Sequence, residues 1–110
     1  MMKIYGIKTC GSVKKAFSFF NEKNIEYEFI DLKKVKLTEQ ELDQWLLYIP
    51  LDKLLNTKGT TYKKLQLKEL NLDDKGKKEW LLKEHMLFKR PIIVSNKSIT
   101  CGVDEFDKHL

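Results

Sequence analysis

The sequence predicts an α/β fold built on a small four-stranded mixed sheet, with a helical insertion between the second and third strands. Three observations predict it. A short apolar strand at residues 4–7 runs into an amphipathic helix, this helix leads to a second strand at residues 27–32, and two further strands near the C-terminus are joined by a tight turn. A crossover helix requires the strands it joins to be parallel, whereas a hairpin makes its strands antiparallel. The sheet is therefore expected to be mixed.

The first strand and helix meet at a tight corner, residues 9–12. Apolar residues at the i, i+3, i+4, i+7 spacing of a buried helical stripe follow it, namely Val13, Ala16, Phe17 and Phe20. Cys10 thus lies where a helix begins, and the free amides and positive dipole there favour thiolate over thiol. A buried structural cysteine is the alternative, because free cysteines are often buried. The exposed position of the junction favours the interpretation that Cys10 is reactive, and Gly11 would let a second molecule approach the backbone.

The helical insertion is expected at about residues 38–86. Thr38 and Glu41 form a capping-box pattern that starts a helix, which Pro50 ends. Its inward residues are Leu42, Trp45, Leu46 and Ile49. After a short helical turn at residues 51–55 and a break at 56–59, Thr60 or Thr61 caps a short helix through Leu65. Asp73 or Asp74 then starts a helix that runs to about His85, with Trp80, Leu81 and Leu87 inward.

The C-terminal part contains the hairpin and a last short helix. Pro91 pushes Arg90 toward an extended conformation and opens a strand at residues 92–94. A turn at Asn96 and Lys97 leads to a strand at residues 98–101. Val103, Phe106 and Leu110 then mark an amphipathic helix that is expected to fray, with His109 in the frayed tail.

Length and composition exclude several classes of protein. The 110 residues, 42% apolar and 34% charged, indicate one soluble domain covering residues 1–110. No apolar run approaches the roughly 20 residues that span a bilayer, and the N-terminal apolar part is too short for a signal peptide, so a cytoplasmic protein without membrane contact is expected. The net charge of +5 comes from scattered lysines, and no motif indicates direct nucleic-acid binding.

The cysteine, histidine and arginine counts narrow the chemistry further. Cys10 and Cys101 lie far apart, which fits neither a disulfide framework nor a metal-ligand pattern, and only two histidines accompany them, so no metal is expected. Of 21 basic residues, Arg90 is the one arginine. Its planar, multi-donor group is the type that binds anions in a fixed geometry, although an ordinary surface charge is the alternative.

Three stretches of the chain carry a family resemblance. They are residues 5–10 (Tyr-Gly-Ile-Lys-Thr-Cys), residues 54–65 (Leu-Leu-Asn-Thr-Lys-Gly-Thr-Thr-Tyr-Lys-Lys-Leu) and residues 89–94 (Lys-Arg-Pro-Ile-Ile-Val). A β-α-β half with a cysteine before its helix, followed by a β-β-α half opened by proline, resembles the thioredoxin fold. The insertion narrows the resemblance to the ArsC/Spx family, closest to its YffB-like branch. The resemblance covers essentially the whole chain.

The resemblance implies roles for several residues. Pro91 would be a cis-proline facing the cysteine, the alternative being a trans-proline that merely starts a strand. Arg90 would lie beside the thiol, lower its pKa and hold an oxyanion or a glutathione carboxylate. Arsenate reductases of the family use three arginines here. Lys58 stands at the position of a second one, and no counterpart of the third lies around residues 100–102, which makes arsenate a doubtful substrate.

The resulting hypothesis is an ArsC-like single-cysteine thiol oxidoreductase. Cys10 would attack the substrate, the Gly11 and Ser12 amides would receive developing charge, and Arg90 and Lys58 would stabilise the anion. Glutathione or glutaredoxin would resolve the adduct, with no bound cofactor. Cys101 is either a resolving thiol or, as its strand position favours, a packed residue.

The alternative function is an Spx-like regulator that binds the RNA polymerase α subunit, and a third is a family member without turnover. Spx regulators usually carry a Cys-x-x-Cys switch, but Val13 stands at the fourth position here.

Overall fold

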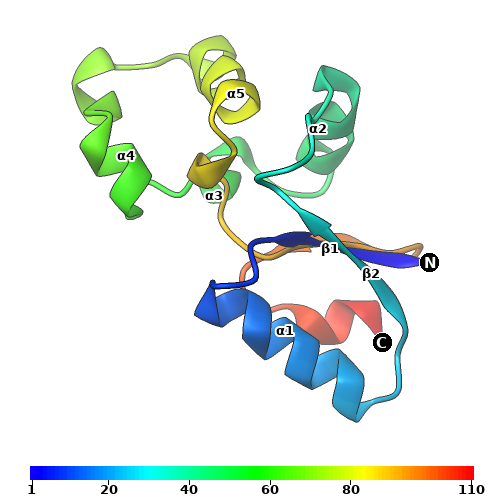
Figure 1. Ribbon diagram of the computed structural model, residues 1–110. Helices are drawn as coiled ribbons and strands as arrows, with labels where there is room; N and C mark the ends of the chain where they lie inside the picture. Colours follow the sequence, from blue (N-terminus) through cyan, green and yellow to red (C-terminus); the bar gives the residue numbers. More distant parts are fainter. The chain divides into compact units, whose positions relative to one another are not determined.

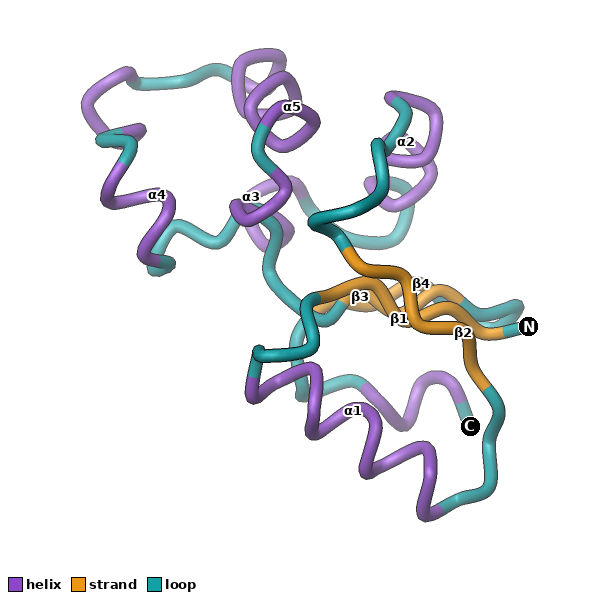
Figure 2. The backbone as a smooth tube through the Cα atoms, in the orientation of Figure 1, coloured by secondary structure: helices purple, strands orange, loops and turns teal.

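The four strands form one mixed sheet, as predicted (Figures 1 and 2). They are β1 (Met2–Gly6), β2 (Tyr27–Asp31), β3 (Ile92–Val94) and β4 (Ile99–Cys101). Their order is β2-β1-β3-β4, with β1 parallel to β2 and antiparallel to β3, and β3 antiparallel to β4. Ile4 pairs with Phe29 on one side and Ile93 on the other. The N-terminal strand therefore joins the two halves of the sheet.

The computed structural model describes residues 1–110, and these residues divide into two compact units. The first contains Met1–Val35 and Arg90–Leu110, including the whole sheet. The second contains Lys36–Lys89, within which the predicted insertion at about residues 38–86 falls. None of the helices has the length and apolar character needed to cross a membrane.

In the first unit, one face of the sheet is covered by α1 (Gly11–Glu22) and by the 3₁₀ turn η3 (Phe106–His109) (Figure 1). Together they enclose an apolar core of Met2, Ile4, Ala16, Phe20, Ile93 and Phe106. Burying a large apolar side chain of this kind contributes about 1.5–3 kcal/mol. The stripe predicted for α1 is confirmed in Val13, Ala16 and Phe20, whereas Phe17 is half-buried and stacks on Tyr27.

Gly6 is needed where β1 leaves the sheet. A Cβ added there would collide with Val13 Cγ2 and would lie 3.4 Å from Cγ1. Val13 is fully buried, so its side chain cannot move away from an added methyl group. The close approach of β1 to the first turn of α1 thus depends on the missing side chain at residue 6.

The second unit consists of short helices. They are α2 (Glu39–Leu46), α3 (Leu51–Leu54), α4 (Thr60–Lys64), the 3₁₀ turn η1 (Leu67–Leu70), α5 (Asp74–Lys83) and the 3₁₀ turn η2 (His85–Leu87). The predicted capping box is confirmed, because the Glu41 amide donates to Thr38 Oγ1 at 3.1 Å and the Thr38 amide donates to Glu41 Oε1 at 3.2 Å. Asp73 caps α5 by accepting from the Gly76 amide at 2.8 Å.

Several predicted boundaries in this unit are wrong. α2 ends at Leu46 rather than next to Pro50, because the chain turns at residues 47–49 and Pro50 instead caps α3. Gly59 is the N-cap of α4, not Thr60 or Thr61. η1 was not predicted. α5 ends at Lys83, where Glu84 adopts an extended conformation.

The inward residues of the unit follow the predictions more closely. Leu42, Trp45, Ile49, Leu81 and Leu87 are buried. Leu46 and Trp80 are only half-buried.

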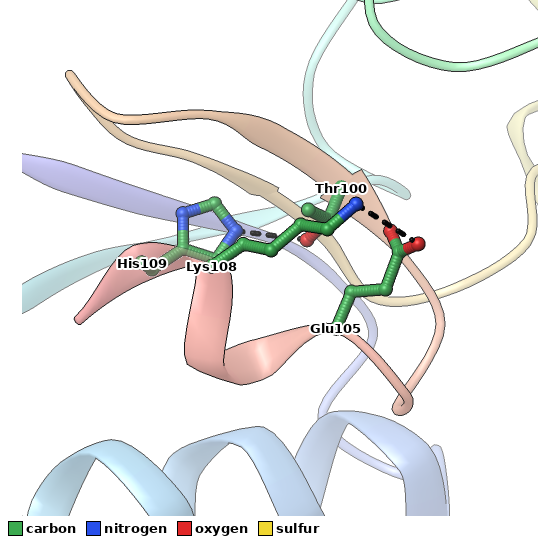
Figure 3. A network of polar contacts seen from close by, with 4 residues as sticks. All are labelled: Thr100, Glu105, Lys108 and His109. Carbon is green, nitrogen blue, oxygen red and sulfur yellow. Dashed lines mark hydrogen bonds and ion pairs between the residues drawn. The ribbon is translucent and has the colours of Figure 1, made fainter.

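The end of the chain departs most from prediction. His109 is only 6% exposed instead of lying in a frayed tail. Its Nδ1 lies 2.6 Å from Ser95 Oγ. Its Nε2 lies 2.8 Å from Thr100 Oγ1 (Figure 3). Lys108, next to it, pairs with Glu105 at 3.3 Å (Figure 3). The imidazole therefore ties η3 to the β3–β4 hairpin.

Candidate functional site

Cys10 lies at the junction that the sequence predicted, immediately before α1. It is the N-cap residue of the helix, with extended backbone angles, and its carbonyl accepts the first helical hydrogen bond from the Lys14 amide at 3.1 Å. The thiol is half-exposed, while Thr9 and Gly11 on either side are exposed. A Cβ added at Gly11 would meet no atom within 4 Å. A second molecule can therefore reach the backbone beside the sulfur.

The surroundings of Cys10 favour its thiolate. Partial burial acts to raise the pKa of the Cys10 thiol, but the backbone N–H groups of Val13 and Ser12 outweigh that effect, together with hydrogen bonding and charge from the Arg90 guanidinium. The net result is a lowered pKa. Both kinds of stabilisation are expected at a helix N-terminus that faces a cation, since each favours the charged form.

Arg90 comes from the opposite end of the sequence. β1 and β3 are antiparallel, with Tyr5 opposite Ile92, so the end of β1 and the start of β3 lie at the same edge of the sheet. The loop that holds Cys10 follows β1, and Arg90 and Pro91 precede β3. The Arg90–Pro91 peptide bond is cis, as the resemblance implied. Pro91 is buried, and its carbonyl accepts from the Gly102 amide at 2.9 Å.

Two other residues were predicted for the site, one in each unit. Ser12 is half-exposed in the first turn of α1 and contributes its amide. Lys58 belongs to the second unit, where it is exposed on the turn that the Gly59 amide closes by donating to the Asn56 carbonyl at 3.2 Å. Its part in the site stays a prediction.

The Val13 amide was missed at the sequence level. The side chain of an N-cap residue faces the amides two and three positions on, which here are those of Ser12 and Val13 rather than of Gly11. Identifying Cys10 as the N-cap residue would have indicated that both of these amides face the thiol.

The second thiol has a structural environment. Cys101 is 3% exposed in β4, pairs with Ile92 across the sheet and is not in a disulfide. This is the packed strand position that the sequence favoured. No three His, Cys, Asp or Glu side chains come together in a way that could hold a metal ion.

The fold and this site define a class: thioredoxin-like proteins with one accessible cysteine at a helix N-terminus and a cis-proline opening the next half of the sheet. The sequence profile of the ArsC family matches residues 5–107, and the chain belongs to the ArsC family.

Individual relatives agree with this assignment. A solved structure of the YffB protein is 29% identical, covers 100% of this chain and 99% of its own, and superposes with a TM-score of 0.89, which places the chain in the YffB-like branch. A Staphylococcus aureus protein is 37% identical, with 98% and 94% of the two chains covered and a TM-score of 0.81. An uncharacterized Haemophilus influenzae protein is 34% identical over 106 residues, 96% of this chain and 93% of its own.

Proposed function

We propose that the protein is a thiol oxidoreductase that uses Cys10 alone, with an external thiol completing each turnover. The observation that carries the proposal is the lowered pKa of an accessible Cys10, which results from two helix amides and the Arg90 guanidinium outweighing partial burial. A thiolate is the reactive form of cysteine. A cysteine that only packs in the core would be neither exposed to solvent nor placed beside a guanidinium.

The reaction follows from having one thiol at the site. The Cys10 thiolate attacks a disulfide sulfur, an S–S bond to Cys10 forms as the substrate's own S–S bond breaks, and the leaving thiolate takes the electron pair and then a proton from water. A second thiol of the glutathione type, or a glutaredoxin, then attacks the Cys10 adduct and releases the free enzyme. The buried Cys101 makes a poor candidate for that second step.

Anion binding would be supplied by Arg90, with Pro91 shaping the edge of the site. The guanidinium offers paired hydrogen bonds to a carboxylate or oxyanion, whereas an ammonium offers only a point charge. A site with one guanidinium is better suited to the carboxylates of a thiol such as glutathione than to arsenate. Gly11 leaves room for the ligand backbone to approach.

The regulator function has less support. Residue 13, where a second switch cysteine would stand, is a buried valine without a thiol, so a local disulfide with Cys10 cannot form. A pull-down with the polymerase α C-terminal domain tests it directly, and capture would favour the regulator.

The proposal is tested by exposing the protein to oxidised glutathione and locating the adduct by mass spectrometry. We expect a glutathione adduct on Cys10, none on Cys101, and none in Cys10→Ser, while Cys101→Ser behaves as the wild type. The pH midpoint of iodoacetamide alkylation should also lie below the value of about 8.5 for a free cysteine. An adduct on Cys101 alone, or a midpoint at the free value, contradicts the proposal.

A further inference from the structure

Gly102 holds the residue that follows Arg90. Its amide donates a hydrogen bond to the Pro91 carbonyl at 2.9 Å, and both residues are buried. This bond extends the β3–β4 ladder by one pair beyond Ile92 and Cys101. Proline has no N–H group, so no second bond can run in the opposite direction within that pair. In the hairpin, the position of the chain next to Arg90 therefore depends on a single donor.

The backbone of Gly102 has a conformation that other residues rarely adopt. Its φ is 82°, which glycine tolerates because it has no Cβ atom. A residue with negative φ would turn either the chain after residue 102 or the peptide unit between residues 101 and 102. The chain after it is held, because Phe106 packs in the apolar core and His109 bonds to Thr100 at 2.8 Å (Figure 3). The peptide unit that carries the donor is therefore the part that would move.

Loss of this donor would displace Arg90. A buried carbonyl without a partner is costly, so Pro91 would shift until its carbonyl reached water or another donor. Arg90 is joined directly to Pro91, and its guanidinium donates a hydrogen bond to the Cys10 thiol. Hydrogen bonds weaken steeply when their geometry is distorted. A change at Gly102 would thus reach the sulfur through two neighbouring residues.

Resting on the proposed function, we infer that Gly102 is a positioning residue for the reaction of Cys10. Its amide fixes Pro91, and Pro91 in turn keeps the Arg90 guanidinium beside the sulfur. The helix amides that also stabilise the thiolate do not depend on this bond. Gly102 therefore controls only the part of the stabilisation that the cation supplies.

The pH midpoint of Cys10 alkylation by iodoacetamide measures this effect. We expect Gly102→Ala to raise the midpoint by at least half of the shift that Arg90→Gln produces, because the guanidinium is displaced rather than removed. Reaction with oxidised glutathione at neutral pH should slow in both variants, since less thiolate is present. When Arg90→Gln is already in place, adding Gly102→Ala should leave the midpoint unmoved, because the two changes act on one interaction.

Asn24→Ala is the matched control. Asn24 also belongs to the first unit and also has a positive φ, 56°, but it lies just beyond the end of α1 that is far from Cys10. Alanine is strained in this conformation at either position. We expect Asn24→Ala to lower stability in urea denaturation and to leave the Cys10 midpoint unchanged. An equal shift of the midpoint in Asn24→Ala and Gly102→Ala would trace the effect to general loosening of the unit and overturn the inference.

A measurement on the wild-type protein does not depend on whether the variants fold. In a two-dimensional amide NMR spectrum, the Gly102 N–H should be protected from exchange with solvent. Its chemical shift should also change with pH along the titration of Cys10, because Pro91 and Arg90 link the two groups. Cys10→Ser should abolish this pH dependence and retain the protection. Rapid exchange of the Gly102 N–H, or a chemical shift that ignores the Cys10 titration, would overturn the inference.

The remaining outcomes separate the inference from the proposed function. An unmoved midpoint in folded Gly102→Ala, or a shift of the same size with and without Arg90→Gln, would overturn the positioning role and leave the Cys10 chemistry intact. A wild-type midpoint at the value of a free cysteine, together with no glutathione adduct on Cys10, would instead refute the proposed function.

Discussion

Replacing His109 by alanine should unfold the C-terminal end of the first unit at lower denaturant concentration. The change removes two hydrogen bonds, to Ser95 Oγ at 2.6 Å and to Thr100 Oγ1 at 2.8 Å. Each contributes about 1 kcal/mol net. The imidazole also packs edge-on against Phe20, at 6.3 Å between ring centroids, and losing a mostly buried ring adds about 1–2 kcal/mol. The total is about 3–4 kcal/mol.

Urea denaturation followed by tryptophan fluorescence and circular dichroism measures this change. Thr100→Val is the matched control, because it keeps the shape of a side chain that is 1% exposed and removes only one of the two hydrogen bonds, at about 1 kcal/mol. The double variant should be less destabilised than the sum of the two single variants by about 1 kcal/mol, since they share one interaction. A loss below about 0.5 kcal/mol for His109→Ala would refute the assignment of a stabilising role.

The same histidine should make stability depend on pH. Burial lowers the pKa of His109 below its ordinary value of 6.5, nearby Glu105 acts to raise it, and Lys108 acts to lower it. The native state thus keeps the ring neutral at pH values where the unfolded chain binds a proton. Stability from this group is therefore complete above the ordinary pKa and is lost as pH falls from about 6.5 toward the lower native value, by at most about 1.4 kcal/mol per pH unit. His109→Gln should lack this slope, and parallel pH profiles for the two proteins would contradict the reasoning.

Three further predictions follow from particular contacts. Gly6→Ala should cost about 1–3 kcal/mol by overpacking against Val13, and the Gly6→Ala, Val13→Ala double variant should recover part of the loss in urea denaturation; additive losses would count against the contact. Arg90→Gln should raise the pKa of Cys10 and move the alkylation midpoint upward, with Arg90→Lys in between and Lys97→Gln unchanged; an unmoved midpoint for Arg90→Gln would remove Arg90 from the site. Thr38→Ala should cost about 1 kcal/mol by opening the capping box, whereas Thr38→Ser should keep it, as thermal unfolding can measure.

The elements that the sequence predicted well are those whose residues decide the structure locally. The period-3.6 stripe of α1 and the capping box at Thr38 each depend on residues within one or two helical turns. The mixed sheet was predictable because a crossover helix and a hairpin each permit one strand direction. Such patterns can be recognised in a single sequence.

The misplaced boundaries depend on backbone conformation that composition does not determine. Gly59 caps α4 through its extended backbone and without a side-chain hydrogen bond, so the two following threonines were misleading. Gln66 and Asn71 adopt left-handed conformations at either end of η1, with φ of 55° and 47°. Gln66 gives no turn signal of the kind that glycine gives, and the 3₁₀ turn was missed as a result.

His109 was misjudged because its partners are not neighbours in sequence. Ser95 and Thr100 lie 14 and 9 residues away, and both belong to the hairpin region around β3 and β4. A histidine near the end of an amphipathic segment has no local feature that distinguishes a frayed residue from a buried one. Only the packing of η3 on the sheet makes the difference.

The Cys10 thiolate is stabilised by neighbours in the sequence and by a residue that is distant in the sequence. The amides of Ser12 and Val13 both follow from the local start of a helix. A β-strand leading into an amphipathic segment was enough to predict the Ser12 amide, whereas the Val13 amide required Cys10 to be identified as the N-cap. Arg90 lies 80 residues later and reaches the sulfur because the pairing of Tyr5 with Ile92 fixes where β3 begins. A shift of that register would move Arg90 from the thiol but leave the helix amides in place. The electrostatics of the site therefore divide into a local part, which other helix N-termini share, and a part that exists only when both halves of the sheet are paired.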